Sequence, residues 1–237
     1  MKKTDILHEG KAKVIYATDS PKHVILAFKD DASAYFGIKK SSIQNKGILS
    51  NKISEIIFTH LAKNGVKTHF IQRLNDREQL CLRTTPLPLE FIVRNVIAGS
   101  LSRRLDIKEG TVPQNTIFEI CLKNDLLRDP MINRTHVTAI GITNDETLDK
   151  IKEIIQQVNA IMVPFFKSAN INLIDFKLEF GVDAQGEILL IDEISPETAR
   201  LWECDSQKIL DSDLFRRDLG NVEESYTDIL NRLQTNI

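Results

Sequence analysis

Cysteine is scarce in this chain of 237 residues, and its placement excludes several classes of protein. The three cysteines, Cys81, Cys121 and Cys204, are far apart in the sequence, odd in number, and form no CxxC pair. Neither a disulfide framework nor a zinc site of paired cysteines is therefore indicated. A reducing compartment suits such a chain, and we expect it to be cytoplasmic.

Long apolar runs and a strong net charge are also missing. No apolar stretch approaches the roughly 20 residues that a membrane helix needs, and the first residues lack the apolar core of a signal peptide. The formal net charge of −2 gives no electrostatic footprint for nucleic acid or a membrane surface, so we expect neither as a partner. The composition, 42% hydrophobic and 27% charged, suits one large or two small globular domains with a substantial core.

Two common phosphate and metal motifs are absent too. The GxxxxGK[ST] spacing of a P-loop does not occur, and the five histidines show no ligand spacing. The nearest feature is Gly10, which is followed by Lys11, Ala12 and Lys13. A glycine beside two lysines can bring backbone N–H groups and ammonium groups onto a phosphate. The alternative for the same residues is a surface turn with two solvated lysines.

What the sequence does contain is a pair of apolar runs around a short turn, between Leu173 and Trp202. Alternation with period two predicts a strand whose two faces differ. One face carries large apolar groups and the other carries charges: Ile174, Phe176, Leu178 and Phe180 against Asp175, Lys177 and Glu179. The second run is almost wholly apolar until it reaches Asp192 and Glu193.

The turn between these runs predicts a hairpin and its register. We expect Lys177 to lie opposite Asp192, and Glu179 opposite Leu190. Glu179 and Asp192 then become diagonal neighbours, about 7–8 Å apart at Cα, and can share one ion, such as a Mg²⁺ that is itself bound to phosphates. The alternative is a half-buried strand whose polar face lies in water.

Elsewhere, hydrophobic periodicity predicts a mixture of strands and helices. Strands are expected over 11–17, 23–28, 66–74, 79–83 and 90–95, and helices over 48–61 and 222–233. A loop is expected over 30–47. Thr143 and Glu146 read as a capping box before a long buried helix that extends to residue 166. Pro86 and Pro88 interrupt the pattern, which predicts a hinge between a β-rich lobe of residues 1–86 and an α+β lobe of residues 87–237.

Several segments together resemble one family, in an order and spacing that span about residues 5 to 235. They are Gly10-Lys11-Ala12-Lys13, Val93-Arg94-Asn95, Ala98-Gly99-Ser100-Leu101, Leu122-Lys123-Asn124-Asp125, Asp129-Pro130, Asp175-Phe176-Lys177-Leu178-Glu179-Phe180-Gly181, Asp192-Glu193-x-Ser195-Pro196 and Arg200-Leu201-Trp202. The family is phosphoribosylaminoimidazole-succinocarboxamide synthase, or SAICAR synthetase. The resemblance implies a two-lobed α+β fold with mainly antiparallel sheets and an ATP cleft between the lobes, similar to protein kinases and ATP-grasp enzymes.

The resemblance also implies a reaction of purine biosynthesis. ATP, L-aspartate and carboxyaminoimidazole ribotide (CAIR) give ADP, phosphate and the succinocarboxamide product, SAICAR. A carboxylate is a poor acyl acceptor, so transfer of the γ-phosphoryl group would first make an acyl phosphate that the aspartate amine displaces. Such a transfer depends mainly on positioning and charge neutralisation. The family further implies Mg²⁺ as cofactor and a homodimer.

Roles for individual residues follow from the same resemblance. Lys11, Ala12 and Lys13 would hold the nucleotide phosphates, the alanine through its backbone, and Glu179 and Asp192 would bind the nucleotide Mg²⁺. The catalytic residues would be Lys123 and Lys177, which neutralise charge near the transferring group, and Asp175, which contacts the ring or sugar of the ribotide. Arg94, Ser100, Arg200 and Arg216 would bind the ribotide, because bidentate arginines suit phosphate and carboxylate.

Two segments depart from the family pattern, and two other functions remain open. Phe36 stands where the family often has an acid or asparagine, and the Gln44-Asn45 segment lacks a common acid, so whether a second metal binds there stays open. One alternative is a small-molecule kinase that uses the same ATP and Mg²⁺ cleft to phosphorylate a hydroxyl. The other is a regulatory module that binds nucleotide without turnover.

Overall fold

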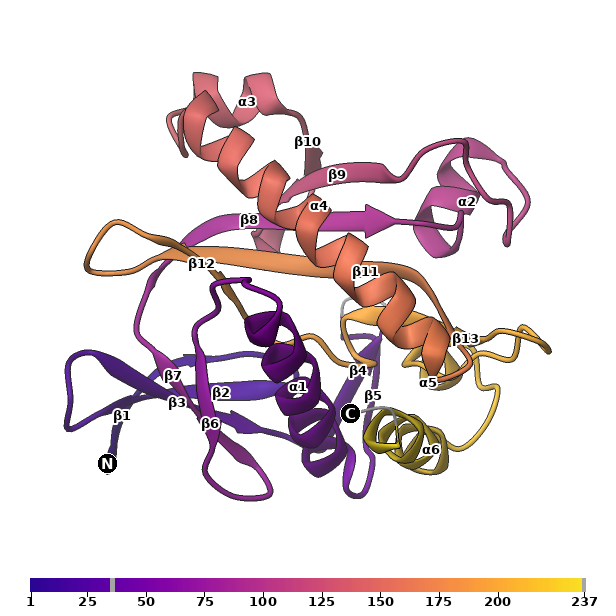
Figure 1. Cartoon of the computed structure of the whole chain (residues 1–237), viewed down its shortest axis with the longest axis horizontal. Coiled ribbons are helices and arrows are strands. Elements are labelled where there is room, and N and C mark those ends of the chain that lie inside the picture. The colour runs from indigo at the N-terminus through magenta and orange to yellow at the C-terminus, as the bar shows by residue number, and fades with distance from the viewer. Residues whose placement is uncertain (35–36, 236–237) are drawn as a thin grey trace.

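A computed structural model describes residues 1–34 and 37–235, and within them the chain forms two main antiparallel sheets with helices packed around them (Figure 1). The N-terminal sheet has the order β1-β2-β3-β7-β6. Its strands are β1 (Lys3–Glu9), β2 (Lys13–Thr18), β3 (His23–Phe28), β6 (Phe70–Arg73) and β7 (Glu78–Leu82). The predicted strands over 11–17, 23–28 and 79–83 are confirmed. Strand β1 was not predicted, because all seven of its residues are exposed and leave no apolar alternation.

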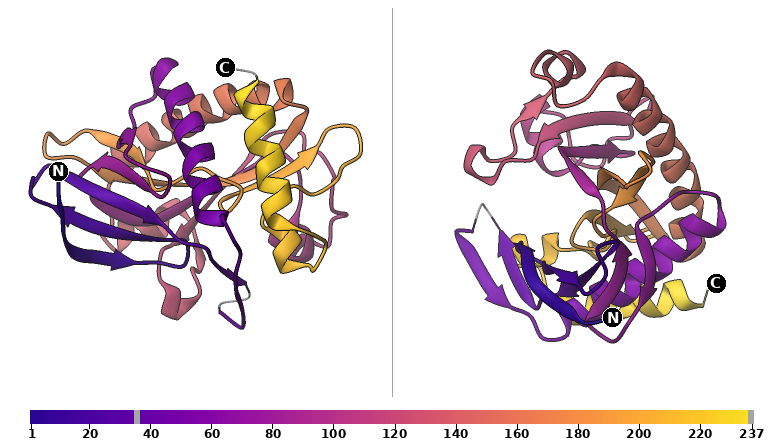
Figure 2. Two further views of the ribbon diagram at one scale, coloured as in Figure 1. Left: turned by 90° about the horizontal axis from the view of Figure 1, so that it is seen from below. Right: turned by 90° about the vertical axis from the view of Figure 1, so that its left-hand side faces the viewer.

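The second sheet has the order β10-β9-β8-β11-β12, and β13 also pairs with β11. Its strands are β8 (Thr85–Arg94), β9 (Ile117–Leu122), β10 (Met131–Ile132), β11 (Ile171–Val182), β12 (Ile188–Ile191) and β13 (Ala199–Glu203). The two sheets form separate layers, and α4 (Asp145–Ser168) crosses one face of the second sheet (Figures 1 and 2). The predicted α+β class with mainly antiparallel sheets is confirmed.

The expected break at Pro86 and Pro88 is wrong, since both prolines lie inside β8. The carbonyl of Pro88 accepts a hydrogen bond from Lys123 N at 3.0 Å, so its missing N–H would also face β9. The β8–β9 ladder begins only at Leu89, so Pro88 lies beyond its end. Pro86 pairs with Gly181 of β11, next to an irregularity in the β8–β11 ladder. Residues up to 82 build the N-terminal sheet and residues from 85 build the second, but the lobe boundary at residues 86/87 stays a prediction.

The stretch over 30–47 is also more regular than expected. Instead of a loop it contains a two-stranded sheet of β4 (Asp31–Ala34) and β5 (Lys39–Ser42). These strands are short and carry lysine, serine and alanine, so they give no apolar alternation in the sequence. The prediction about Phe36 lies outside the described residues.

The predicted helices are found, with small differences at their starts. Helix α1 (Lys46–Lys63) begins two residues earlier than expected and ends before Asn64 and Gly65, where Gly65 has a positive φ of 84°. The capping box of Thr143 and Glu146 is wrong: Asn144 caps α4 by accepting from Thr147 N at 2.8 Å. The remaining helices are α2 (Gly99–Leu105), the 3₁₀ turn η1 (Asp125–Leu127), α3 (Arg134–Ala139), α5 (Asp213–Arg216) and α6 (Val222–Gln234).

The alternation predicted for β11 is confirmed on its apolar side. Ile174, Phe176, Leu178 and Phe180 are each at most 1% exposed, and most of them join the main core with α1, α4 and α6. Burying one such side chain contributes about 1.5–3 kcal/mol. The polar side is buried as well: Asp175 is 3% and Glu179 is 2% exposed. The alternative of a polar face in water is therefore wrong, and these carboxylates need partners.

The predicted hairpin register is wrong by one residue. Glu179 pairs with Ile191 and Phe180 pairs with Leu190, whereas Glu179 was expected opposite Leu190. An unbroken strand in this register would turn Asp192 to the other face of the sheet. Strand β12 ends at Ile191, however, and Asp192 takes a left-handed backbone with φ of 69°. This departure from strand geometry brings its carboxylate back beside Lys177.

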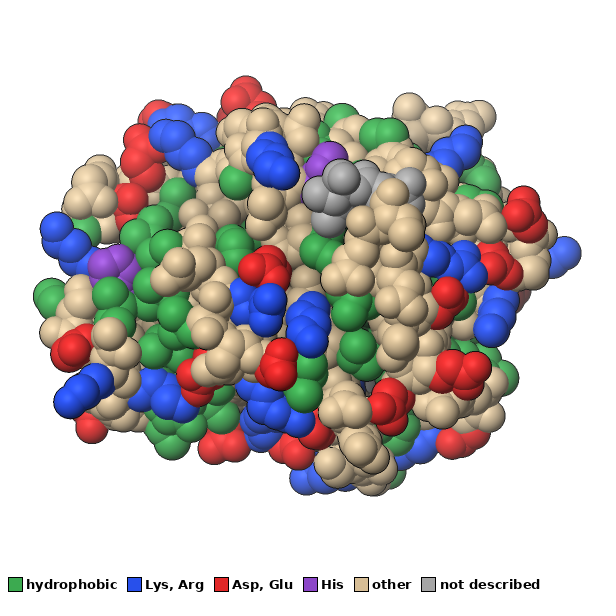
Figure 3. Space-filling model, turned by 60° about the horizontal axis from the view of Figure 1, so that its bottom comes forward, with side chains coloured by type: hydrophobic (Ala, Val, Ile, Leu, Met, Phe, Trp, Pro, Cys, Tyr) green, Lys and Arg blue, Asp and Glu red, His purple; other side chains and the backbone are tan. Residues whose placement is uncertain are grey.

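On one face of the molecule, charges of both signs are interspersed rather than gathered by sign (Figure 3). On the face in Figure 3, basic and acidic side chains alternate over the described residues, as the net charge of −2 suggests. Among the described helices, none is both long and apolar enough to cross a membrane.

Candidate active site

The polar side of β11 meets the end of β12 in a cluster of lysines and carboxylates, which we call the lysine cluster (Lys13, Lys123, Lys177, Glu90, Glu179, Asp192 and Glu193). The ammonium of Lys177 lies 2.7 Å from Glu179 Oε1, 3.4 Å from Asp192 Oδ2 and 3.2 Å from Glu90 Oε1. Lys123 pairs with the other oxygen of Glu179 from the end of β9. Glu179 on β11 and Asp192, directly after β12, therefore face the same ammonium group.

Lys13 completes this cluster from the N-terminal sheet. It pairs with the carboxylates of both Asp192 and Glu193. Burial alone would raise the pKa of Asp192, but the ammonium groups of Lys13 and Lys177 hold that pKa far below its usual range. Burial also lowers the pKa of Lys13, while carboxylates outweigh burial at Lys177 and raise its pKa. The cluster therefore keeps Asp192 ionised at neutral pH.

The donor chemistry of this cluster fits Mg²⁺. The described residues hold no group of three or more His, Cys, Asp or Glu side chains arranged as a complete metal site. Mg²⁺ usually binds through only one or two carboxylates together with waters and substrate phosphates. Glu179 and Asp192 supply two such carboxylates around a single ammonium, which a divalent cation with its phosphates could displace.

A second group surrounds Asp175 on the same strand; we call it the arginine cluster (Arg94, Arg200, Arg216, Ser100, Glu119, Asp175 and Asp213). Asp175 Oδ2 accepts from Arg94 Nη1 at 2.7 Å and from Arg200 Nη1 at 2.8 Å. Arg94 also donates to Ser100 Oγ at 3.1 Å and to Glu119 Oε2 at 2.7 Å. Arg94 is only 2% exposed, so its guanidinium is held in one orientation by three partners.

Asp213 joins the remaining arginines to this cluster. It accepts from Arg200 Nε at 3.0 Å and from Arg216 Nη1 at 2.8 Å. Burial opposes ionisation here, but the two guanidinium groups lower the pKa of Asp213 to about 2. The structure thus brings Arg94, Ser100, Arg200 and Arg216 together around Asp175, Asp213 and Glu119.

The two clusters lie four residues apart along one strand face. Asp175 belongs to the arginine cluster and Glu179 to the lysine cluster, and both side chains are on the polar side of β11. At about 3.3 Å per residue, their Cα atoms are roughly 13 Å apart. A single strand therefore fixes the spacing between the two sets of charged groups.

Lys11 and Ala12 lie apart from both clusters, at the turn between β1 and β2. Lys11 Nζ contacts Asp125 Oδ1 of η1 at 3.0 Å, and the two side chains are 55% and 77% exposed. The pair closes one side of a hollow of about 550 Å³, which is lined by Glu9, Gly10, Lys11, Lys29, Asp31, Ala32, Ser33, Lys40, Ser41, Ser42 and Asp125. Ala12 presents its carbonyl to Lys29 N at 2.7 Å.

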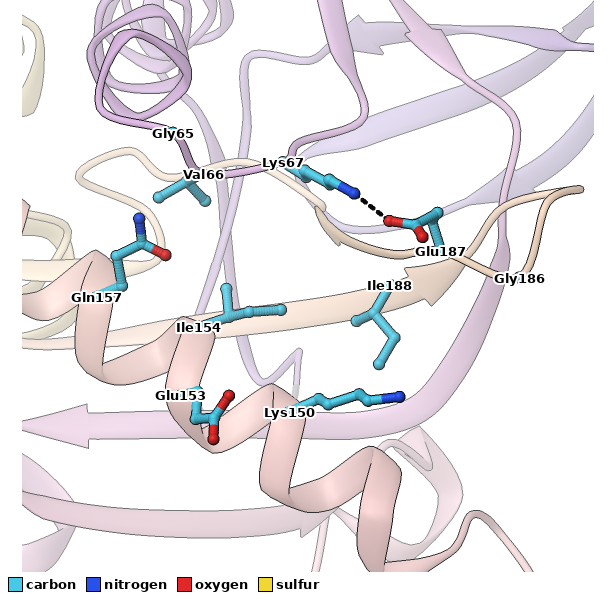
Figure 4. Close-up of a pocket in the computed structure, with 10 residues that line it drawn as sticks. All are labelled: Gly65, Val66, Lys67, Lys150, Glu153, Ile154, Gln157, Gly186, Glu187 and Ile188. Carbon is cyan, nitrogen blue, oxygen red and sulfur yellow. Dashed lines mark hydrogen bonds and ion pairs between the residues drawn. The ribbon is translucent and has the colours of Figure 1, made fainter.

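Another cavity, of about 380 Å³, lies on a different part of the molecule (Figure 4). Its residues come from the segment between α1 and β6, from α4, and from the turn between β11 and β12 with the first residue of β12. They include Lys67, Glu153 and Glu187, and none of the predicted site residues. We therefore do not assign the active site to it.

Some residues of both clusters were not predicted from the sequence. Glu90 and Glu119 stand singly in strand-like segments, which gave no spacing signal, and the same is true of His69 beside the lysine cluster. Glu193 was noted next to Asp192, but no role was predicted for it. Asp213 had one signal, since it follows Asp211 and Ser212 shortly before Arg216. Burial raises the pKa of Asp211 to about 7, and this side chain accepts from the backbone N–H groups of Leu201 and Asp213.

Comparison with known proteins identifies the family of this chain. The family model described as SAICAR synthetase matches residues 6–233. The chain belongs to the SAICAR synthetase family. It is 52% identical over 233 residues to the phosphoribosylaminoimidazole-succinocarboxamide synthase of Clostridium botulinum strain Eklund 17B, which covers 98% of this chain and 99% of the relative.

Solved SAICAR synthetases have the same fold. The enzyme of Ehrlichia chaffeensis superposes with a TM-score of 0.95 at 42% identity and covers 98% of this chain and 99% of its own. A SAICAR synthetase in complex with ADP superposes with a TM-score of 0.93 at 43% identity over 96% and 97% of the two chains. The chain is therefore an ATP-dependent carbon–nitrogen ligase of purine biosynthesis, and the small-molecule kinase is not favoured.

Proposed function

We propose that the lysine cluster binds the phosphates of ATP and that the arginine cluster binds CAIR, so that β11 sets the two reactants face to face. The observation that carries this proposal is the placement of Asp175, Lys177 and Glu179 on one polar strand face, with each cluster gathered at one end of it. Holding two reactants in a reactive geometry accounts for a large part of catalysis in phosphoryl transfer.

On the nucleotide side, Lys13, Lys123 and Lys177 supply three ammonium groups. Ammonium groups are compact charges on flexible stems, so they can follow negative charge as it moves from the γ-phosphoryl group to ADP. Lys11 and the backbone of Ala12 lie at the turn that precedes Lys13, where they would reach the phosphates further from the chemistry. The exposed pair of Lys11 and Asp125 is weak enough to open for a nucleotide.

Glu179 and Asp192 are the residues that would hold Mg²⁺. When bound, the cation would neutralise phosphate charge and orient the γ-phosphoryl group. The chain's own contribution is to keep the Asp192 carboxylate ionised, because the neighbouring ammonium groups of Lys13 and Lys177 lower its pKa. Glu179 is buried and the Asp192 side chain is only 11% exposed, which strengthens each electrostatic interaction in the site.

On the ribotide side, Arg94 and Arg200 point planar guanidinium groups at Asp175. Such groups recognise phosphate and carboxylate through paired hydrogen bonds. CAIR carries one phosphate and one carboxylate. These groups would replace some of the protein's own carboxylates as hydrogen-bond partners of the arginines. Ser100 and Arg216 would add a hydroxyl and a further guanidinium, and Asp175 would accept from polar hydrogens on the ring or sugar.

The reaction then proceeds in two displacements. A carboxylate oxygen of CAIR attacks the γ-phosphorus, the bond to the bridging oxygen breaks, and ADP leaves with those electrons. The amine of L-aspartate next attacks the acyl carbon, a proton is lost from nitrogen, and phosphate leaves as the amide forms. Lys177, the lysine-cluster residue that lies between Asp175 and Glu179 along β11, would neutralise charge in both steps.

Two incubations, with and without L-aspartate, test this function against its alternatives. With ATP, CAIR and L-aspartate together, we expect ADP, phosphate and SAICAR in equal amounts. A stable phosphorylated product formed without aspartate would instead support a kinase. Failure to release phosphate with all three substrates present would support a regulatory nucleotide-binding module.

Two coarser properties complete the proposal. The resemblance to the family supports a homodimer, which light scattering after size-exclusion chromatography would test by mass. The scarcity of cysteine and the place of the reaction in purine biosynthesis support a cytoplasmic enzyme. All three cysteines are free thiols in the structure, which is consistent with a reducing compartment.

A further inference from the structure

A short segment before β6 ties the two sheets together beside the lysine cluster. Thr68 forms a parallel bridge with Leu190 of β12. Leu190 N donates to Lys67 O at 3.0 Å, and His69 N donates to Leu190 O at 2.9 Å. On its other side, His69 O accepts from Leu82 N of β7 at 2.7 Å. The backbone of His69 is therefore fixed by both sheets.

The side chain of His69 reaches the residue that follows β12. Its Nε2 lies 2.9 Å from the carbonyl oxygen of Asp192, and the residue is 4% exposed. A carbonyl only accepts, so the ring must carry its proton on Nε2 and donate it. The ring packs against Phe58 with a centroid separation of 5.6 Å, which leaves it little freedom to turn.

The backbone of Asp192 adopts a conformation that such a contact can stabilise. Its φ of 69° lies in the left-handed region, which residues other than glycine adopt only when their surroundings enforce it. The ion pairs of Asp192 with Lys13 and Lys177 engage its carboxylate, the group that must change partners when a nucleotide and cation bind. The bond from His69 engages the backbone instead, so it can persist through that exchange.

We propose that His69 is a positioning residue, whose Nε2–H bond to the Asp192 carbonyl holds the left-handed turn that aims the Asp192 carboxylate at Glu179 and Lys177. This inference rests on the proposed role of Asp192 in the nucleotide site. His69 itself would touch neither substrate nor cation. Its contribution is to hold the Asp192 side chain on the same face of the sheet as Glu179, whereas the hairpin register alone would direct that side chain to the opposite face.

Two amide variants that differ by one methylene test this role. In His69→Gln, the amide nitrogen reaches about as far as Nε2 and can donate to the Asp192 carbonyl. In His69→Asn, the amide is too short to make that bond. Calorimetry with ADP, in the presence and absence of Mg²⁺, measures how much Mg²⁺ tightens nucleotide binding in each variant.

We expect Mg²⁺ to tighten ADP binding in His69→Gln to within about 2-fold of the wild-type effect. In His69→Asn the tightening should fall by about 10-fold, because a buried carbonyl loses its donor and the turn relaxes. Affinity for ADP without Mg²⁺ and affinity for CAIR should stay within about 2-fold of wild type in both variants. A merely structural role would lower all of these affinities together.

Phe58→Leu is the matched control, since it disturbs the packing of the His69 ring but leaves the hydrogen bond possible. We expect it to lower the melting temperature and keep the Mg²⁺ effect. Equal Mg²⁺ effects in His69→Gln and His69→Asn would overturn the positioning role and leave the metal assignment intact. Wild-type ADP binding that does not respond to Mg²⁺ would overturn the metal assignment and this inference with it.

Discussion

The two ends of the β11 polar face solve different chemical problems with different cations. At one end, Lys177 and two further lysines meet carboxylates through compact ammonium groups on flexible stems. At the other end, Arg94 and Arg200 meet Asp175 through planar groups that are each held by several partners. Mobile point charges suit a phosphoryl group in transfer, whereas fixed planar groups suit a ligand that must be recognised and kept still.

The largest effect is expected at the carboxylates of the lysine cluster. Glu179→Gln or Asp192→Asn should lower kcat by about 10³-fold, because each removes a charge that acts in a buried site. Thermal melting should show that the variants stay folded. Steady-state kinetics at saturating Mg²⁺ measures the effect, and near-normal turnover in either variant would mean that the metal assignment is wrong.

At the arginine end, the main effect should be on binding. Arg200→Ala should weaken CAIR binding by about 100-fold, since it removes a guanidinium and leaves Asp175 and Asp213 with one partner fewer. Affinity for ATP should change by less than about 3-fold, because the lysine cluster is intact. Calorimetry with each ligand checks the contrast, and a loss confined to ATP would reverse the roles of the two ends.

The pH dependence of the free energy of unfolding should differ between the wild type and Asp213→Asn. The pKa of Asp213 is lowered from 3.8 to about 2, so the folded state binds fewer protons than the unfolded state between these values. The carboxylate therefore stabilises the fold above pH 3.8 by about 2 kcal/mol, and this is lost as the pH falls toward 2. Urea unfolding should show Asp213→Asn less stable than wild type at pH 6, with a smaller difference at pH 3. A constant difference would contradict the ion pairs with Arg200 and Arg216.

The smallest effect should come from crowding Arg200 without removing it. A Cβ on Gly99 would lie 2.4 Å from Arg200 Nη2, so Gly99→Ala should displace that guanidinium and raise the KM for CAIR by about 10-fold. Gly141→Ala is the control, because Gly141 also has a positive φ but nothing lies within 4 Å of its Cβ position. Steady-state kinetics should show no change in KM for the control. Equal changes in both variants would mean that backbone strain, and not Arg200, is responsible.

The fold was predicted where hydrophobic periodicity is strong. Helix α1 and the apolar side of β11 follow directly from residues such as Ile53, Ile57 and Phe180, which are buried as the pattern requires. Strand β1 and the β4–β5 pair could not be found in this way, because exposed short strands need no apolar alternation. Pro86 and Pro88 misled for a related reason: whether a proline breaks a strand depends on which neighbour its missing N–H would face.

The candidate site shows a similar division. The carboxylates and lysine on β11 were visible as an alternating pattern. Asp213 and Glu119, which contact Arg200 and Arg94, and His69, which contacts Asp192, come from distant segments that only the fold brings close. The position of Asp192 was predicted through a register that is one residue wrong. Its left-handed backbone restores the expected neighbour, and no pattern of apolar and polar residues encodes such a turn.

The central claim is that one strand face holds the nucleotide at Lys177 and the ribotide at Asp175. A crystal structure with ADP, Mg²⁺ and CAIR bound tests it most directly. We expect the terminal phosphate of ADP and the cation beside Lys177, Glu179 and Asp192, with CAIR held by Arg94 and Arg200. Nucleotide phosphates on the arginines, or CAIR bound away from Asp175, would contradict it.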